Sequence, residues 1–255
     1  MPAPALAPLL RTDAFGRRLH YFAELPSTQN AAQAGAAAGE PHGALYWAET
    51  QTAGRGRHGH TWISPPGAGL YFTLLLRPEQ SAQSLLGLTL AAGLAIADAV
   101  LTDTGLLADI RWPNDLLLRN RKFCGILLEA GSDTDCLFLG VGINLAAVAL
   151  PAELEPIATS LQQECGRPVP PLPFLATVLA QLERRYADFL ARGMAGVRAE
   201  FEARSSFARG RSVTVGVGSE QFEGITEGLD SAGFLLVRRR DGSRQTIYSG
   251  DVRPR

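Results

Sequence analysis

The sequence contains little cysteine and little histidine, which excludes several kinds of site. Its 255 residues include 3 cysteines and 4 histidines. Cys124, Cys136 and Cys165 are odd in number and widely spaced, so they predict reduced, mostly buried thiols rather than a disulfide framework or a thiolate metal centre. Free thiols are typical of a cytoplasmic protein. No metal-ligand spacing connects the histidines, which are His20, His42, His58 and His60.

The sequence also lacks an excess of charge of either sign. Its 24 basic residues nearly balance 25 acidic ones, and the net charge is −1. Such a chain has no general attraction for nucleic acid or for an anionic membrane, so any affinity for anions must be local. No apolar run reaches the roughly 20 residues that span a bilayer, and residues 1–10 lack the basic start of a signal peptide. We expect neither a DNA partner nor a membrane partner.

Several common catalytic motifs are absent as well. The sequence has no Gly-x-x-x-x-Gly-Lys-Ser/Thr phosphate loop, no His-Glu-x-x-His zinc motif and no Gly-x-Ser-x-Gly nucleophile elbow. An enzyme of this sequence that uses ATP would therefore need a different phosphate site.

The composition, 46% hydrophobic and 19% charged, is that of a globular protein, and the length fits one large domain with a small appendage. Ser27 or Thr28 can cap an alanine-rich helix that Gly39 ends. Short turns at 119–121 and 131–134 favour antiparallel pairing of the strands that they join. The expected strands are 19–25, 43–50, 69–76, 109–112, 115–118, 122–129 and 136–143, and the expected helices are 28–38, 81–100 and 173–190.

The composition changes near residue 210, where short β segments begin to alternate with turns. Asp241-Gly242 is a strong hairpin signal. About 45 residues of this kind predict a small barrel-like module that packs on the larger domain, because so short a chain buries little surface alone. We expect the larger domain over 1–208 and the β module over 209–255, with strands at 212–217, 222–229, 234–240 and 245–248.

The most unusual stretch is the loop from Gly54 to Trp62, called here the Gly/Arg loop, in which glycines alternate with arginines. Glycine lets a ligand approach backbone N–H groups, while Arg55 and Arg57 offer forked donors for carboxylate or phosphate. The loop predicts a site for a small anion that orders it on binding. On this stretch alone, an ordinary basic surface loop and an RGG-like nucleic-acid segment remain open.

A second cluster is Arg111-Trp112-Pro113-Asn114-Asp115. Its proline restricts the backbone and presents the amide and the carboxylate rigidly. Such a pair can orient a cationic side chain or hold hydrated Mg²⁺, although an Asn-Asp turn without a ligand fits as well. Lys122 opens the next strand, where a lysine is usually a solvated edge charge. It would face the same cavity as the Gly/Arg loop if Asn114 and Asp115 lie across the tight turn.

Gly140-Val141-Gly142-Ile143-Asn144 is a third cluster. It fails as a dinucleotide fingerprint, because no third glycine, no helix and no acidic residue follow at the required spacing. We interpret it as a central strand in which glycines permit close approach, with Asn144 as its polar end.

In order and spacing these motifs resemble those of biotin protein ligases. The resemblance rests on Ser27-Thr28, Gln51 with the Gly/Arg loop, the Trp-Pro-Asn-Asp cluster, the run from Lys122 through Gly125 to Glu129, and the Gly140–Asn144 strand. It implies an α+β fold, with a mixed and mainly antiparallel sheet packed with helices as in class II synthetases, and a small C-terminal SH3-like β-barrel. It further implies that biotin and MgATP give biotinyl-5′-AMP, from which biotin passes to a lysine of the biotin carboxyl carrier protein of acetyl-CoA carboxylase.

The resemblance also implies roles for individual residues. Lys122 and Arg57 would be catalytic, since they offset the charges of carboxylate and phosphate. Asn114, Asp115 and Asn144 would bind or orient Mg²⁺, the phosphates or Lys122, with Asn114 and Asp115 as the candidates for the metal. By likeness, Trp62 would lie against the adenine. The residues implied for biotin are Ser27, Thr28, Gln29, Gln51, Arg55, Gly56, Arg57, Lys122 and Gly125. Those implied for ATP and the adenylate are Arg55, Arg57, Trp62, Asn114, Asp115, Lys122 and Asn144.

Three positions depart from the family pattern. Gln29 stands where Asn is common, Arg111 replaces Lys, and His60 replaces Arg. A lipoate ligase is the nearest alternative reading, and the Gly/Arg loop and the Trp-Pro-Asn-Asp cluster favour biotin. Some relatives are repressors with an N-terminal winged helix of roughly 60 residues, whereas the first expected strand here starts near Leu19, so we expect no such module. Whether the chain forms a homodimer is left open.

Overall fold

The computed structural model describes residues 4–78, 85–131, 136–148, 151–217 and 220–254. Its centre is a seven-stranded sheet in the order β1-β2-β3-β7-β6-β5-β4. Strands β1 and β2 are parallel, and every other neighbouring pair is antiparallel. The strands are β1 (Leu19–Leu25), β2 (Leu45–Gln51), β3 (Gly69–Leu76), β4 (Asp109–Arg111), β5 (Asp115–Leu118), β6 (Arg121–Ala130) and β7 (Leu137–Asn144).

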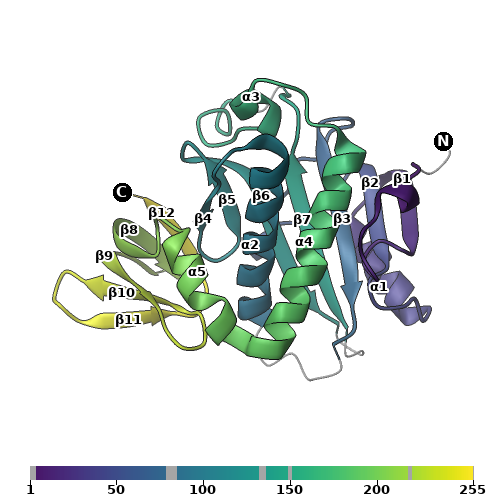
Figure 1. The fold of residues 1–255 in the computed structure, drawn as a ribbon. Coiled ribbons are helices and arrows are strands. Elements are labelled where there is room, and N and C mark those ends of the chain that lie inside the picture. Colours follow the sequence, from purple (N-terminus) through teal and green to yellow (C-terminus); the bar gives the residue numbers. More distant parts are fainter. Residues whose placement is uncertain (1–3, 79–84, 132–135, 149–150, 218–219, 255) are drawn as a thin grey trace.

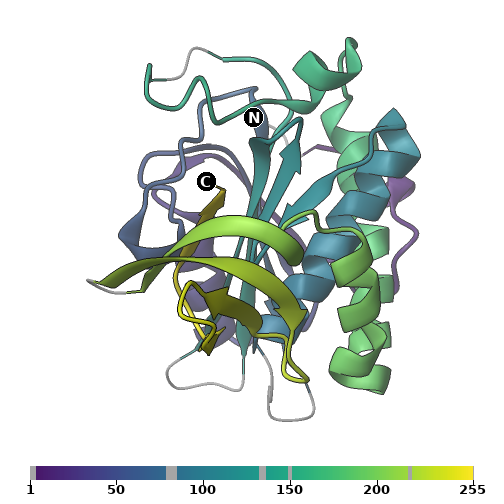
Figure 2. The same ribbon diagram turned by 90° about the vertical axis from the view of Figure 1, so that its left-hand side faces the viewer.

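The two faces of this sheet are covered differently. Two long helices, α2 (Leu85–Thr104) and α4 (Pro171–Arg192), lie side by side over one face (Figure 1). In Figure 2 the sheet is seen nearly edge-on, with both helices on the same side of it. Leu45 and Trp47 belong to the core beneath these helices, whereas Tyr46 between them packs with α1 (Thr28–Ala37) on the opposite face. This alternation is the two-residue period of a strand buried on both faces.

Helix α2 is the most apolar helix among the described residues. Its segment Leu86–Thr104 is long and apolar enough to cross a membrane by length and composition, with a mean hydropathy of 1.5. However, 72% of its most apolar 18-residue window is buried inside the protein. A core helix packed between a sheet and a second helix is hydrophobic all round for that reason.

Glycines leave the face that carries α1 open at its centre. Gly142 on β7 is directly opposite Gly125 on β6, and Gly140 is two residues along on the same face. The three glycines form a patch of the sheet without side chains, called here the glycine floor. The side chains of Trp62 and Gln29 lie over it. The prediction of a central strand that permits close approach is confirmed.

The C-terminal strands form a second, antiparallel sheet in the order β11-β10-β9-β8-β12. Its apolar residues join the core of the first sheet without a break. One direct link is the indole Nε1 of Trp112, which donates to the carbonyl of Gly233 at 3.0 Å. The strands are β8 (Arg209–Val217), β9 (Glu220–Leu229), β10 (Leu235–Arg239), β11 (Arg244–Ile247) and β12 (Asp251–Pro254).

Most elements expected from the sequence are found within a few residues of their expected bounds. Ser27 caps α1 by accepting from Gln29 N, and the turn between β5 and β6 has positive φ at both Arg119 and Asn120, the geometry of a tight two-residue hairpin turn. Residues 81–84 of the expected second helix and most of the turn at 131–134 lie outside the described residues. The sequence did not predict β12, α3 (Leu161–Cys165), α5 (Arg198–Ala203), or the short 3₁₀ turns at 7–9, 57–59 and 193–196.

Candidate active site

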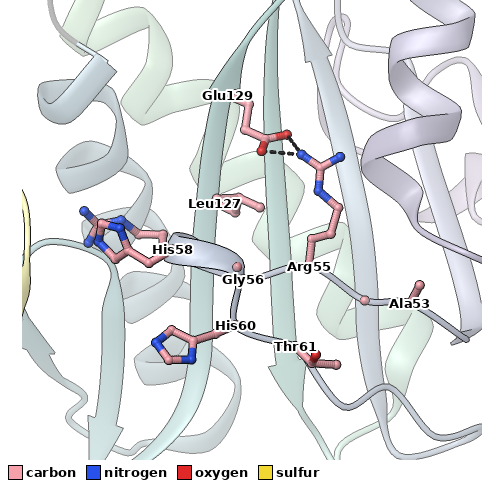
Figure 3. Close-up of a pocket in the computed structure, with 11 residues that line it drawn as sticks. Ala53, Arg55, Gly56, His58, His60, Thr61, Leu127 and Glu129 are labelled. Atoms are coloured by element: carbon pink, nitrogen blue, oxygen red, sulfur yellow. Dashed lines mark hydrogen bonds and ion pairs between the residues drawn. The ribbon is translucent and has the colours of Figure 1, made fainter. Parts of the chain in front are cut away.

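The Gly/Arg loop folds back on itself over the open face of the sheet. Gly56 N donates to His60 O at 2.7 Å, and Trp62 N donates to Gly54 O at 2.9 Å. His58 and Gly59 have φ of 54° and 77°, so the tip uses left-handed backbone that favours glycine. The loop lines a cavity of about 440 Å³ together with Leu127 and Glu129 of β6 (Figure 3).

Arg55 ties this loop to two different elements. Its guanidinium forms an ion pair with Glu129 on β6, drawn as dashed lines in Figure 3, and donates to Asn30 Oδ1 on α1 at 2.8 Å. Both charged side chains are about one-third exposed. The pair therefore positions the loop over the sheet at modest energetic value.

The end of the loop places Trp62 on the glycine floor. A Cβ added at Gly142 would lie 2.4 Å from the indole, and one added at Gly125 would lie 2.9 Å from it. Only glycine fits beneath the ring at these positions. Lys122 Nζ lies 5.2 Å from the ring centroid, and the buried indole Nε1 has no hydrogen-bond partner among the described residues. The indole thus has a donor available at the centre of the site.

A network of neutral groups lies where α1 begins. Gln51 Oε1 accepts from both the backbone N of Thr28 at 2.9 Å and its hydroxyl at 3.1 Å, and Gln51 Nε2 donates to Ser64 Oγ at 2.9 Å. The buried hydroxyl of Thr73 on β3 donates to Thr28 Oγ1 at 2.9 Å. We call these residues, with Ser27, the neutral network. It offers donors and acceptors without net charge.

Gln29, one of the positions that depart from the family pattern, is buried under the same helix. Its amide Nε2 donates to the carbonyls of Leu127 at 3.0 Å and Phe138 at 3.4 Å. A Cβ at Gly140 would meet this amide at 2.9 Å. Its Oε1 is buried with no partner among the described residues. Gln29 therefore fills part of the glycine floor and keeps one free acceptor next to the neutral network.

Charged side chains gather at the opposite end of the floor. Asp115 Oδ1 is 2.6 Å from Lys122 Nζ, and its Oδ2 is 2.6 Å from Arg111 Nη2. Burial raises the pKa of the Asp115 carboxyl, but Lys122 and Arg111 outweigh burial and bring its pKa below the usual value. Lys122 is only 30% exposed, so it is not a solvated edge charge. It is also the only lysine in the sequence.

Arg57 connects this group to the Gly/Arg loop. Its Nη1 donates to Asn114 Oδ1 at 3.1 Å, and Asn114 Nδ2 donates to Ile126 O on β6 at 2.9 Å. Three cations and one carboxylate thus converge at the tight turn, and Asp115 lies across it from Lys122, which is the condition that the sequence analysis set. The residues that line the cavity of the Gly/Arg loop do not include Lys122. We call Arg57, Arg111, Asn114, Asp115 and Lys122 the charged cluster.

The charged cluster also bears on the expected Mg²⁺ site. Both oxygens of Asp115 and the side-chain oxygen of Asn114 already accept from cationic side chains. Among the described residues, no group of three His, Cys, Asp or Glu side chains could hold a metal ion. Direct Mg²⁺ binding by this pair would displace two ion pairs and the hydrogen bond from Arg57. The pair's direct role toward Mg²⁺ stays a prediction.

Asn144 ends β7 beside a second, smaller cavity. Its Nδ2 donates to the carbonyl of Thr159 at 3.0 Å, and it lines a cavity of about 210 Å³ with Arg121, Thr159 and Ser160. This cavity and the charged cluster lie along β6, where Thr159 N donates to the carbonyl of Lys122 at 2.9 Å. The structure thus brings every predicted site residue to one face of the sheet.

Sequence reasoning missed several members of these groups. Ser64 and Thr73 complete the neutral network, and Asn30 and Glu129 hold Arg55. Glu129 ends the run from Lys122 through Gly125, but the sequence analysis assigned it no role. Strand register decides these contacts, since Thr73 reaches Thr28 only because β3 lies beneath α1.

Comparison with known proteins agrees with this geometry. Residues 21–144 match the Biotin/lipoate A/B protein ligase family, and residues 209–253 match the Biotin protein ligase C terminal domain. The first match contains the Gly/Arg loop, the charged cluster and Asn144, and the second begins at the first residue of β8.

Individual relatives cover most of the chain. A Biotin--[acetyl-CoA-carboxylase] ligase of Paracoccus denitrificans is 37% identical over 215 residues, which are 80% of this chain and 88% of the relative. The Bifunctional ligase/repressor BirA of Bacillus subtilis is 34% identical over 248 residues, 95% of this chain and 76% of the relative. A structure of biotin protein ligase from Aquifex aeolicus with biotin and ATP superimposes with a TM-score of 0.83 at 29% identity, covering 94% of this chain and 100% of that one. The chain belongs to the biotin protein ligase family.

Proposed function

We propose that this chain is an ATP-dependent biotin protein ligase. It joins biotin to AMP and then passes the biotinyl group to a lysine of the biotin carboxyl carrier protein of acetyl-CoA carboxylase. The observation that carries the proposal is the placement of a neutral network and a charged cluster at opposite ends of one glycine floor under the Gly/Arg loop. Biotin has the same two chemistries, a neutral ureido ring at one end and a carboxylate at the other.

The neutral network is suited to the ureido ring. That ring carries two N–H donors and one carbonyl acceptor, and Ser27, Thr28 and Gln51 offer both kinds of group. Burial makes these hydrogen bonds selective, because a ligand that leaves a buried polar group unpaired loses binding energy. Gln29 contributes its free Oε1 from the same side. Gly56 lets the rest of the biotin lie close to the backbone of the loop, whereas the space over Gly125 is taken by Trp62 and Lys122.

The charged cluster is suited to the adenylation step. In that step a biotin carboxylate oxygen attacks the α-phosphorus of ATP, and the bond to the β-phosphate oxygen breaks to release pyrophosphate. Two anions must approach one another, so cations fixed beside them lower the barrier. Lys122 and Arg57 take this role, while Asp115 and Asn114 hold them in place. ATP carries its Mg²⁺ on the phosphates.

Trp62 and Asn144 complete the nucleotide side. Trp62 offers an aromatic face and a free N–H over the floor, and Asn144 offers an amide at the second cavity. We place the adenylate against both, with Arg55 and Arg57 closing the Gly/Arg loop above it. Closure matters because water would hydrolyse the mixed anhydride.

In the second step the ε-amine of the acceptor lysine attacks the carbonyl carbon of biotinyl-AMP. An amide bond forms, the bond to the phosphate oxygen breaks, AMP leaves and the amine loses a proton. We assign these steps to residues 1–208, and treat 209–255 as a β module that supports the hairpin of the charged cluster through Trp112. The three cysteines are free thiols, in keeping with a cytoplasmic setting.

Pyrophosphate release tests the proposal most simply. The purified chain is mixed with MgATP and either biotin or lipoate, and a carrier domain is added in its natural form or with the acceptor lysine changed to arginine. We expect pyrophosphate release with biotin but not with lipoate, and we expect biotin to be attached only to the carrier that keeps its acceptor lysine. Release with lipoate but not with biotin would make the chain a lipoate ligase and refute the proposal.

A further inference from the structure

A buried carboxylate outside the groups described above lies close to them. Glu164 belongs to the short helix α3, and its side chain is only 2% exposed. Arg121 Nη2 lies 2.6 Å from Oε1, and Arg119 Nε lies 3.3 Å from Oε2. The hydroxyl of Thr159 donates to Oε1 at 2.6 Å. A buried charge is tolerated only when it is paired in this way, so the contacts form one unit.

Thr159 connects this carboxylate to two residues of the site. Its hydroxyl faces Glu164, its carbonyl accepts from Asn144 Nδ2 at 3.0 Å, and its N–H donates to the carbonyl of Lys122 at 2.9 Å. Lys122 N donates in turn to Ile157 O at 2.8 Å. The segment 157–159 therefore pairs with β6 at the proposed catalytic lysine, and only 2% of Thr159 is exposed.

The carboxylate does not itself reach a ligand. The cavity of about 210 Å³ is lined by Asn144, Thr159 and Arg121, and by Ser160 and Gln163 at the start of α3. Glu164 is not among its lining residues. Any effect of Glu164 on a nucleotide must pass through Thr159 and Arg121. This places it behind the site and not within it.

We propose that Glu164 and the Thr159 hydroxyl position the nucleotide side of the site. The carboxylate anchors Thr159 through its hydroxyl, so that the Thr159 carbonyl is held where it orients the Asn144 amide and the Thr159 N–H is held against β6 at Lys122. The inference deepens the proposed function and rests on it where adenylation is measured. The neutral network lies at the other end of the floor, so biotin binding does not depend on this pair.

The test compares Thr159→Val with Thr159→Ser. Valine keeps the shape of threonine and removes the hydroxyl, whereas serine keeps the hydroxyl. We expect Thr159→Val to weaken binding of a non-hydrolysable ATP analogue and to lower kcat/KM for ATP by about tenfold each, a modest misplacement effect. The KM for biotin should change less than twofold, and Thr159→Ser should restore both ATP parameters. Glu164→Gln, which removes the charge, should resemble Thr159→Val.

A stability control separates positioning from general loosening. Glu202 is also largely buried, pairs with Arg209 and accepts from Leu229 N at 2.8 Å, but it lies at the C-terminal strands. Glu202→Gln should lower Tm without changing the ratio of the two KM values. If Thr159→Val and Glu164→Gln bind the analogue within twofold of the natural chain, or lose biotin and ATP affinity equally, the proposal is overturned. A natural chain that binds the analogue but releases no pyrophosphate with biotin refutes the proposed function, and analogue binding still decides the positioning role.

Discussion

The neutral network and the charged cluster differ in how they are built. In the neutral network, hydrogen bonds of 2.9 to 3.1 Å join Thr28, Gln51, Ser64 and Thr73, and Ser27 accepts from Gln29 N at 3.3 Å. Four of its five members are buried. In the charged cluster, two ion pairs of 2.6 Å share one carboxylate, and the side chains of Arg111, Asp115 and Lys122 are 15 to 30% exposed. Buried neutral groups discriminate by leaving wrong ligands unpaired, whereas partly exposed cations stabilise developing charge. We therefore expect recognition at one end of the floor and chemistry at the other.

Removing Lys122 should slow adenylate formation, the step that we assign to the charged cluster. We expect Lys122→Met to slow single-turnover adenylate formation by roughly 100-fold, about 3 kcal/mol, the usual cost of a lost positioned donor. Lys122→Arg should recover part of the rate, because it keeps the charge but not the compact ammonium. Formation by Lys122→Met within about threefold of the natural rate would show that the lysine is not catalytic.

Removing the Thr28 hydroxyl should weaken biotin binding, which we assign to the neutral network. Thr28→Val leaves the buried hydroxyl of Thr73 without its acceptor and Gln51 with one donor fewer. We expect the KM for biotin to rise about tenfold, since the ureido ring loses a buried hydrogen-bonding partner, which costs about 1–3 kcal/mol. The KM for ATP should stay constant, and Thr28→Ser serves as the control that keeps the hydroxyl. An equal rise in both KM values would contradict the assignment.

Arg57→Gly tests whether the Gly/Arg loop retains the adenylate. The change removes the contact to Asn114 and adds a glycine to a loop already rich in it, so closure should cost about 1 kcal/mol more and preformed biotinyl-AMP should dissociate about fivefold faster. Released adenylate should label lysines of bystander proteins. Because Lys122 is the only lysine in the chain, this label cannot be confused with acylation of other lysines in the enzyme. An unchanged off-rate would mean that the loop is not the lid.

Asp115→Asn should lower stability with a defined pH dependence. The pKa of Asp115 is lower folded than unfolded, so the stability that it contributes is present above the unfolded pKa of about 3.9 and is lost as the pH falls through the folded value. We expect the natural chain to exceed Asp115→Asn in unfolding free energy by about 1 kcal/mol at pH 7. Urea unfolding at several pH values should show this difference shrinking below pH ~4. A difference that grows in acid would contradict the sign.

The sequence predicted the strands and long helices because their patterns are local. Gly69–Leu76 is an apolar run of strand length, and the turn at Arg119–Asn120 is short enough to dictate antiparallel pairing. Helix α3 was missed because its five residues carry no period, and β12 because it depends on pairing with β8. Elements with a local sequence pattern could therefore be predicted, whereas those that depend on contacts between distant segments could not.

For the site, sequence motifs supplied the residues but not their contacts. The ion pair of Lys122 with Asp115 follows from a two-residue turn, which is why it could be anticipated. Glu164 could not, because its three partners come from a hairpin and a separate segment that meet only in the folded chain. Ser64 and Thr73 were missed for the same reason.

Adenylate formation at limiting and at saturating biotin, measured side by side for Thr28→Val and Lys122→Met, tests the division of labour most directly. A recognition defect is a loss of binding and is overcome by excess ligand, whereas a defect in stabilising the transition state is not. We expect saturating biotin to restore Thr28→Val to the natural rate and to leave Lys122→Met roughly 100-fold slow. Recovery of both variants, or of neither, would contradict it.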